Sequence, residues 1–287
     1  MSEQPLLDVE NLWVRFQTRT GIFDAVRGVS FTLGKERLGI VGESGSGKSM
    51  TGRAILRLIR PPGMIEADRM EMKGEDILNA SETRMRQLRG GRVSMIMQDP
   101  KFSLNPVMPV GQQMVEALRA HQKISKAKAR IRAIEALDEV AIREPERVFD
   151  LYPHEVSGGM GQRIMIAMML LPDPEILIAD EPTSALDVSV QLQVLDIMDK
   201  LVRDRGMGLI LISHDLNLVA KFCDRIVIMY AGRIVETCAA HDLRNASHPY
   251  TLGLLNSVPD LENPRDRLEV LQRDPAWLDA PSVSARR

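Results

Sequence analysis

The chain has 287 residues, of which 44% are hydrophobic and 26% charged, and its formal net charge is −2. This length allows one large α/β domain, or one domain with an appended piece, and the composition is that of an ordinary globular protein. The near-neutral charge disfavours nucleic acid as the main partner. The apolar runs reach about eight residues, short of the ~20 needed to cross a bilayer, and the start MSEQP lacks a secretory pattern, so we expect a cytoplasmic protein.

Eight segments rich in Val, Ile and Leu are predicted to be strands. In chain order they are LLDVENLWVRF, GVSFTL, RLGIV, RVSMIM, ILIAD, GLILIS, RIVIMY and RIVE. Several central segments are apolar at nearly every position, which favours parallel strands buried on both faces. The N-terminal segments alternate more, as in an antiparallel sheet with one wetter face. A mixed α/β core follows.

Helical patterns are predicted in four places. They are the run MTGRAILRLI, residues 126–140, the segment after Gly159, and residues 188–205. In the last helix the buried stripe is predicted to consist of Leu192, Leu195, Met198 and Val202. Gly206 is expected to end that helix.

A basic cluster marks the helix over residues 126–140. Its members are Lys123, Lys126, Lys128, Arg130 and Arg132. We expect a solvated helix face, with the core stripe supplied by Ile131, Ile134 and Leu137.

The stretch from about 100 to 172 contains little strand signal. It is predicted to be a helical subdomain inserted in the main domain, which spans residues 1–259. Residues 260–287 form a C-terminal extension rich in proline and charge, for which packing and partial disorder are both open. Cys223 and Cys238 have no CxxC spacing, so neither a disulfide framework nor a cysteine metal site is supported.

Residues 42–49, GESGSGKS, match the full GxxxxGK[ST] phosphate-loop pattern, after the strand RLGIV and before a helix-forming run. Lys48 is expected to reach the β and γ phosphates, and the Ser49 hydroxyl to bind Mg²⁺. The pattern with both flanks favours nucleotide binding over an incidental glycine-rich turn. The residues expected at the nucleotide are Gly42, Glu43, Ser44, Gly45, Ser46, Gly47, Lys48, Ser49 and Met50.

Two adjacent carboxylates, Asp180 and Glu181, follow the four apolar, strand-like residues of the segment ILIADEP at 176–182. In P-loop proteins an acid at such a strand end holds the Mg²⁺ shell, which predicts Asp180 as a ligand through water. Glu181 is then placed to orient or deprotonate the attacking water. Alone, such a pair is usually a solvated strand end, and the upstream phosphate loop favours the catalytic interpretation.

Gln98 and His214 each stand where an apolar strand is predicted to emerge into a loop. Ligands of open α/β sheets bind outside such strand ends, and a hydrogen-bonded loop residue is the alternative. A further segment, VSGGMGQR at 156–163, places a hydroxyl residue and two glycines before an apolar run. This is the form of an anion-binding helix start.

The ordered series GESGSGKS, Gln98, VSGGM, ILIADE, SALD at 184–187 and His214 resembles the ATP-binding-cassette (ABC) ATPases over residues 6–259. The resemblance implies an ABC-type P-loop ATPase that binds ATP and Mg²⁺ and hydrolyses ATP. It further implies that Gln98 contacts Mg²⁺ or the attacking water, that Glu181 is the general base, and that His214 contacts the γ-phosphate. The resemblance also implies that Asp187 is the last residue of the D-loop, SALD at 184–187.

In this family the serine-glycine signature caps the γ-phosphate held by a partner cassette, so that two chains meet head to tail around two ATP molecules. The matching residues here are Ser157, Gly158, Gly159 and Met160. An aromatic residue before the phosphate loop is implied to stack on adenine. Phe16 fits best, and Phe23 is the competitor.

The segments QDPKFSLNPVMPVG, YPHEVSGGM, IADEPTSALDVSVQ and HPYTLGLLNSVP are similar to the ATPase subunits of bacterial oligopeptide, dipeptide and nickel importers. The resemblance implies two permease subunits, an external solute-binding protein, and a place at the cytoplasmic face of the membrane. A second, related ATPase subunit is the expected partner, with a homodimer as the alternative. The cysteine-rich segment of many such subunits is missing, so we expect no iron–sulfur cluster.

A proline-interrupted apolar segment follows Gln98. Its residues are Phe102, Leu104, Pro106, Val107 and Met108. They either pack within the helical subdomain or line a groove for a cytoplasmic helix of the permease. Two rivals to transport are a soluble ABC ATPase acting on DNA or ribosomes and a regulatory module without turnover. The sequence shows no basic extensions or coiled-coil insertions, which disfavours the ATPase acting on DNA or ribosomes. It retains Glu181 and His214, which disfavours the module without turnover.

Overall fold

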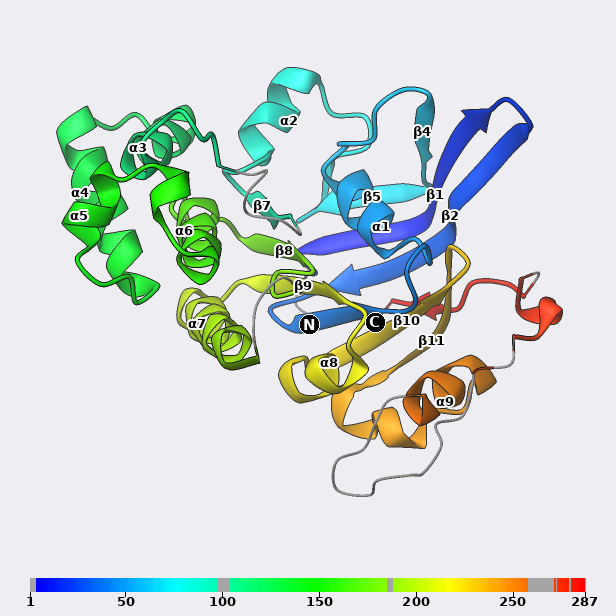
Figure 1. Ribbon diagram of the computed structural model, residues 1–287. Helices are drawn as coiled ribbons and strands as arrows, with labels where there is room; N and C mark the ends of the chain where they lie inside the picture. The colour runs from blue at the N-terminus through cyan, green and yellow to red at the C-terminus, as the bar shows by residue number, and fades with distance from the viewer. Residues whose placement is uncertain are drawn as a thin grey trace. The chain divides into compact units, whose positions relative to one another are not determined.

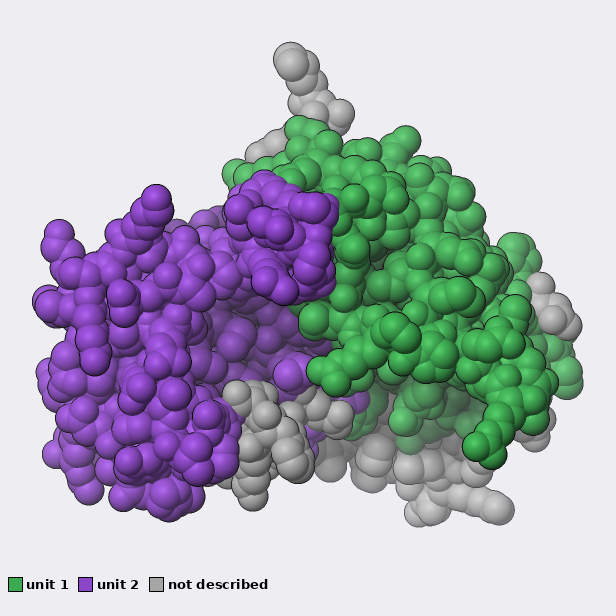
Figure 2. Space-filling view, turned by 90° about the horizontal axis from the view of Figure 1, so that it is seen from above, with its two compact units in different colours: residues 1–80, 210–287 green, residues 81–209 purple. Residues whose placement is uncertain are grey.

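A computed structural model describes residues 4–97, 104–184, 188–257, 271, 273–278 and 280–286, and its helices and strands are drawn in Figure 1. The chain divides into two compact units, coloured in Figure 2. Unit 1 consists of residues 1–80 and 210–287, and unit 2 of residues 81–209. In the described part of the chain, no helix combines the length and the hydropathy that a bilayer span requires.

One sheet of unit 1 is built mainly from the N-terminal strands. It contains β1 (Leu7–Thr18), β2 (Gly21–Leu33), β4 (Gly63–Glu66), β5 (Arg69–Met72), β6 (Glu75–Asp76) and β12 (Ser284–Ala285). The strand order is β12-β2-β1-β5-β6, and β4 also pairs with β1. β1 and β2 form an antiparallel hairpin with Leu7 opposite Leu33, so the predicted antiparallel N-terminal sheet is confirmed. β12 runs parallel to β2.

The second sheet of unit 1 follows the order β11-β10-β3-β9. The strands are β3 (Arg37–Val41), β9 (Gly208–Ser213, of which residues 210–213 belong to unit 1), β10 (Arg225–Tyr230) and β11 (Arg233–Ala239). β10 is parallel to β3 and antiparallel to β11. β9 is buried along its whole length, as its uninterrupted apolar sequence predicts.

Helices flank these strands in unit 1. They are α1 (Lys48–Ile55), α8 (Leu216–Phe222) and α9 (Pro249–Asn256), with short 3₁₀ turns over Ala240–Asn245 and Pro275–Leu278. α8 lies directly on β3, because a Cβ at Gly39 would overlap Val219 and touch Cys223. Burial and the nearby Glu236 and Asp242 carboxylates raise the pKa of the other thiol, Cys238, to about 11.

Unit 2 is mostly helical. Its elements are α2 (Glu82–Leu88), β7 (Val93–Ile96), α3 (Val110–His121), α4 (Lys126–Glu139), α5 (Pro145–Asp150), a 3₁₀ turn (Pro153–Glu155), α6 (Gly158–Leu170), β8 (Ile176–Asp180) and α7 (Val188–Arg205). β7 and β8 pair in parallel, with Val93 opposite Ile176, and every residue of β8 is buried. Both strands were expected from their apolar runs.

The predicted helices α4 and α7 are confirmed, but two of their predicted core residues are wrong. Ile131 is 57% exposed and Leu192 is 63% exposed. The buried residues of α4 are Ala129, Ala133, Ala136 and Leu137. Alanines at the contact allow neighbouring helices to approach closely, so the buried face of α4 is not the one with the largest apolar side chains.

Candidate functional site

The phosphate-loop segment of residues 42–49 lies between β3 and α1 in unit 1. Gly42 and Gly47 have φ angles of 153° and 99°, in the region that side chains rarely adopt. A Cβ at Gly42 would overlap the Met229 carbonyl, and one at Gly47 would come within 2.6 Å of the Ala25 carbonyl. The two glycines therefore hold the loop against the backbone of β2 and β10.

Lys48 is the first residue of α1 and is 5% exposed. Its Nζ donates hydrogen bonds to the carbonyls of Gly42 and Glu43, both at 2.8 Å. The first turn of α1 contains no acidic residue, so the positive helix terminus and the ammonium lie in one loop. This combination suits a polyphosphate.

Two aromatic residues compete as the adenine-stacking residue, and the hairpin register pairs them directly. Phe16 lies opposite Phe23 in β1 and β2, so both side chains belong to the same face of the hairpin. Phe23 is 59% exposed, whereas Phe16 is half-buried and its ring lies near Gly63.

His214 follows β9 in unit 1 and is exposed. The next residue, Asp215, caps α8 by accepting a hydrogen bond from the Leu218 N–H at 3.0 Å. The Ser213 hydroxyl accepts one from the Asp215 N–H at 3.0 Å. The backbone on both sides of the histidine is thus fixed by local hydrogen bonds.

Asp180 and Glu181 lie together at the end of β8 in unit 2. Asp180 is 2% exposed, which is unusual for a carboxylate. Glu181 has a φ of 47°, and its carbonyl accepts hydrogen bonds from the N–H and hydroxyl of Ser184 at 3.3 and 3.2 Å. A left-handed φ is uncommon for a non-glycine residue, and the two bonds from Ser184 hold the turn in this conformation.

The serine-glycine segment begins α6 in unit 2. Ser157 is the N-cap, and its hydroxyl accepts a hydrogen bond from the Met160 N–H at 3.3 Å. Ser157 and Gly158 are exposed, and a Cβ at Gly158 would have no atom within 4 Å. A Cβ at Gly159 would lie 2.8 Å from Val190 of α7. The first glycine leaves open space beside the helix start, and the second permits close packing.

The contrast between Gly159 and Gly161 yields a stability prediction. Gly161→Ala is expected to stabilise the protein by about 0.5–1 kcal/mol, because a Cβ there meets nothing within 4 Å and alanine favours helix. Gly159→Ala is the matched control, and it should not stabilise the protein in this way, because its Cβ clashes with Val190. Urea unfolding of the three proteins measures the difference. Equal stability of Gly161→Ala and the parent chain would contradict the prediction.

The candidate residues fall into two groups. The phosphate loop, Phe16 and His214 belong to unit 1, and Asp180, Glu181 and the serine-glycine segment belong to unit 2. Gln98, Asp187 and Phe102 lie outside the described residues. Within the described ranges, no group of three or more His, Cys, Asp or Glu residues is placed to hold a metal ion.

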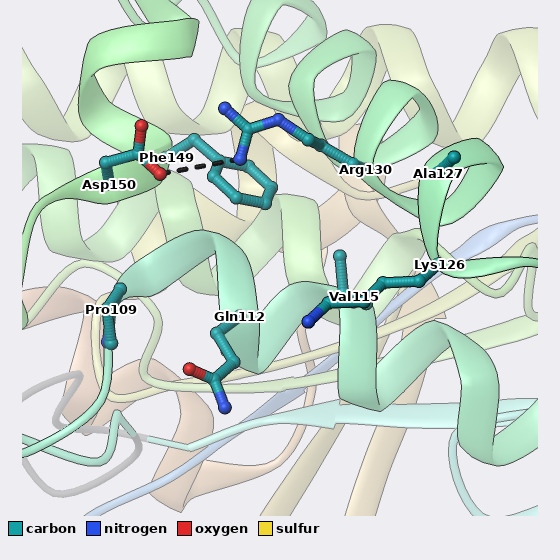
Figure 3. Close-up of a pocket in the computed structure, with 8 residues that line it drawn as sticks. All are labelled: Pro109, Gln112, Val115, Lys126, Ala127, Arg130, Phe149 and Asp150. Carbon is teal, nitrogen blue, oxygen red and sulfur yellow. Dashed lines mark hydrogen bonds and ion pairs between the residues drawn. The ribbon is translucent and has the colours of Figure 1, made fainter.

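Unit 2 also contains a pocket of about 460 Å³ between α3, α4 and α5 (Figure 3). Its lining residues are Pro109, Gln112, Val115, Lys126, Ala127, Arg130, Phe149 and Asp150. Figure 3 shows Arg130 beside Asp150 and the Phe149 ring. The guanidinium carbon lies 4.1 Å from the centroid of that ring, and a guanidinium nitrogen lies 3.4 Å from the Asp150 carboxylate. Among the residues proposed for the permease groove, Leu104 is buried and Val107 is 81% exposed.

Tyr250 is a neighbour of the phosphate loop that was not predicted from the sequence. Its hydroxyl accepts a hydrogen bond from the Glu43 N–H at 3.1 Å. Arg273 reaches the same residue through an ion pair of 2.8 Å with the Glu43 carboxylate. The HPYT motif was the available signal for Tyr250, but its spacing alone does not indicate a contact across 207 residues.

The chain has a strand, a glycine-rich loop and a helix that begins with a buried lysine. It also has an acidic pair at the end of a buried strand. Together these features define a P-loop ATPase fold. A family model described as ABC transporter matches residues 26–184, more than half of the chain. The chain therefore belongs to the ABC transporter family, and the predicted fold class is confirmed.

Similar proteins cover most of the chain. A putative peptide import ATP-binding protein of Brucella abortus (strain 2308) is 47% identical over 97% of this chain and 83% of its own length. The oligopeptide transport ATP-binding protein OppD of Bacillus subtilis (strain 168) is 49% identical, with 90% and 73% covered. The dipeptide transport ATP-binding protein DppD of Escherichia coli (strain K12) is 46% identical, with 93% and 82% covered.

Solved structures agree with this family. A dimeric structure of a bacterial ABC transporter cassette superimposes with a TM-score of 0.73 at 26% identity, covering 82% of this chain and 99% of that one. A dimeric post-hydrolysis state of an ATP-binding cassette bound to ADP and Pi gives 0.71 at 25% identity, with the same coverage. The resemblance to ABC ATPases is thereby confirmed.

Proposed function

We propose that this ABC ATPase drives the import of di- or oligopeptides through a membrane transporter. The observation that carries the proposal is the similarity to peptide-import ATP-binding proteins over as much as 97% of the chain. The intact phosphate loop and acidic pair support turnover and disfavour a regulatory module. A net charge of −2 and the transport names of the relatives disfavour action on DNA or ribosomes. Nickel or another small solute is the alternative cargo.

The phosphates of ATP are proposed to bind residues 42–50, where the N–H groups of the loop and the α1 terminus surround them. The Lys48 ammonium then binds the β and γ phosphates. Phe16 is the proposed adenine-stacking residue. Glu181 is proposed to take the proton of the attacking water, and His214 to contact the γ-phosphate.

The residues proposed for Mg²⁺ fit that ion by chemistry. Ser49 offers a half-buried hydroxyl at the start of α1, and Asp180 offers a buried carboxylate, proposed to act through a water. Both are the oxygen donors that Mg²⁺ prefers, and Gln98 is the third proposed ligand. Bound Mg²⁺ would neutralise charge on the transferred phosphate.

The serine-glycine segment is proposed to act on a partner cassette. Ser157 and the exposed Gly158 lie at a helix start with open space beside it, which suits an external phosphate. Gly159 and Met160 complete the segment, and Asp187 is proposed to lie at the same interface. The dimeric state of the structural neighbours supports this assignment.

The proposed assembly contains this chain, a second related ATPase, two permease subunits and, indirectly, a solute-binding protein outside the cell. This chain would then lie at the cytoplasmic face of the membrane, bound through the permeases. The exposed Val107 is a candidate contact for a permease helix, because a large apolar side chain with 81% exposure gains from being covered.

The assembled transporter in lipid vesicles tests the proposal. ATP hydrolysis should rise when the solute-binding protein is loaded with peptide. Labelled peptide should accumulate in the compartment that contains the ATPase subunits and ATP. A nickel-loaded binding protein is the control for the alternative cargo. Stimulation by neither solute, or nucleic-acid binding without membrane association, would contradict the peptide-import assignment.

A further inference from the structure

Tyr250 is a fully buried polar residue next to the proposed phosphate site. Its relative exposure is 0%, and its hydroxyl accepts a hydrogen bond from the Glu43 N–H at 3.1 Å. The carbonyl of Glu43 accepts a hydrogen bond from Lys48 at 2.8 Å. Glu43 therefore links the phenol of α9 to the ammonium of the phosphate loop through its own peptide groups.

The start of α9 is fixed by two residues outside the helix. His248 is its N-cap, and the Nδ1 atom accepts a hydrogen bond from the Tyr250 N–H at 3.1 Å. Glu236 of β11 accepts hydrogen bonds from the N–H and hydroxyl of Ser247 at 2.7 and 3.1 Å. The backbone that carries Tyr250 is consequently tied to the sheet.

The Tyr250 ring lies in an aromatic cluster that includes the C-terminal segment. Tyr230 of β10 lies 4.6 Å from it, centroid to centroid, and Trp277 lies 6.1 Å from it. Trp277 also contacts Tyr230 at 5.9 Å and His248 at 5.7 Å. Tilted and edge-on arrangements are the ones that aromatic pairs prefer, so these contacts hold the ring of Tyr250 in place.

The segment that carries Trp277 is anchored at both ends. At one end, Arg273 pairs with Glu43 of the phosphate loop at 2.8 Å. At the other end, the Val283 N–H donates to the Ile234 carbonyl at 2.8 Å. Between these two ends, the Leu278 carbonyl accepts a hydrogen bond from Arg233 of β11 at 2.8 Å. The described part of the extension is therefore packed on unit 1.

We propose that Tyr250 is a positioning residue that orients the phosphate loop for ATP, and that Trp277 holds its ring in place. The inference rests on the proposed function, since it assumes that residues 42–50 bind ATP. Without the phenol, the Glu43 N–H loses its hydrogen-bond partner. The Gly42–Glu43 peptide group, whose carbonyl accepts a hydrogen bond from Lys48, is then held by one contact fewer. A loop that is ordered before binding gives higher affinity, so the loss appears in binding and leaves the chemical step intact.

The test uses calorimetric titration of ATP into the full chain without Mg²⁺, which prevents turnover. Tyr250→Phe removes one oxygen and should raise the Kd for ATP by about 3- to 10-fold, the effect of one lost hydrogen bond, at unchanged stoichiometry. Tyr230→Phe is the matched control from the same cluster, because the Tyr230 hydroxyl has no hydrogen bond among the described residues. It should leave the Kd unchanged.

Two further variants separate the possible failures. Trp277→Ala should raise the Kd in the same direction as Tyr250→Phe, and both should raise KM in the assembled transporter with kcat within about twofold. Lys48→Ala should weaken ATP binding by at least about tenfold. An unchanged Kd for Tyr250→Phe and Trp277→Ala, or a loss of stoichiometry alone, overturns the positioning role. Unchanged binding by Lys48→Ala instead contradicts the proposed nucleotide site.

Discussion

Glu181→Gln is expected to retain ATP binding and to lose about 10²- to 10⁴-fold of the hydrolysis rate, or roughly 3 to 5 kcal/mol of transition-state stabilisation. The amide cannot accept the proton of the attacking water, yet it has nearly the shape of the carboxylate. Glu181 follows the buried strand β8 directly, next to the buried Asp180. With hydrolysis blocked, the ATP-bound dimer should accumulate.

The chain offers a closely matched control. Glu144 is also a glutamate of unit 2 with a left-handed φ, 52°, but it lies before α5 and pairs with Arg147 at the surface. Glu144→Gln should leave turnover unchanged. Single-turnover hydrolysis and size-exclusion chromatography with ATP measure the two effects. Near-normal hydrolysis by Glu181→Gln would exclude this residue as the general base.

Ser157→Asp is expected to lower ATP hydrolysis by about 10²- to 10³-fold at the partner's site, the range seen when one preorganised donor at a reacting oxygen is lost. Aspartate is as good an N-cap as serine, so α6 should keep its stability. Its carboxylate, however, would repel the γ-phosphate that the serine is proposed to cap. Ser157→Ala is the complementary variant, because it removes the cap at a cost of about 1 kcal/mol without adding charge.

The location of the effect tests whether the segment acts across a dimer. When Glu181→Gln silences this chain's own site, Ser157→Asp in the same chain should abolish the remaining hydrolysis by its partner. When the partner's base is silenced instead, Ser157→Asp should have little effect. The reverse pattern would show that the serine serves the nucleotide of its own chain.

The local parts of the fold could be predicted from the sequence. β8 and β9 have uninterrupted apolar runs, and the glycines of residues 42–49 indicate the phosphate loop, because each pattern reflects a requirement of the segment itself. Ile131 and Leu192 were assigned to the core wrongly. Periodicity locates large apolar residues, whereas the buried face of α4 is formed mainly by alanines.

Contacts between distant segments could not be predicted. The bond between Tyr250 and Glu43 joins residues 207 positions apart, and neither residue has a local feature that requires the other. The C-terminal extension is a similar case, since its high content of proline and charge is compatible with disorder. Its described part is ordered through partners elsewhere in the chain, such as the pairs of Arg286 with Asp8 and Glu10.

β12 has a consequence for the handling of the protein. It covers the outer edge of β2, and the Ala285 carbonyl accepts a hydrogen bond from the buried Arg225 at 2.7 Å. A chain cut before Ser282 would expose unpaired backbone groups along β2, which invites edge-to-edge association between molecules. It would also remove one acceptor from a guanidinium that is hidden from water. Residues 282–286 are therefore expected to govern the solubility of the protein.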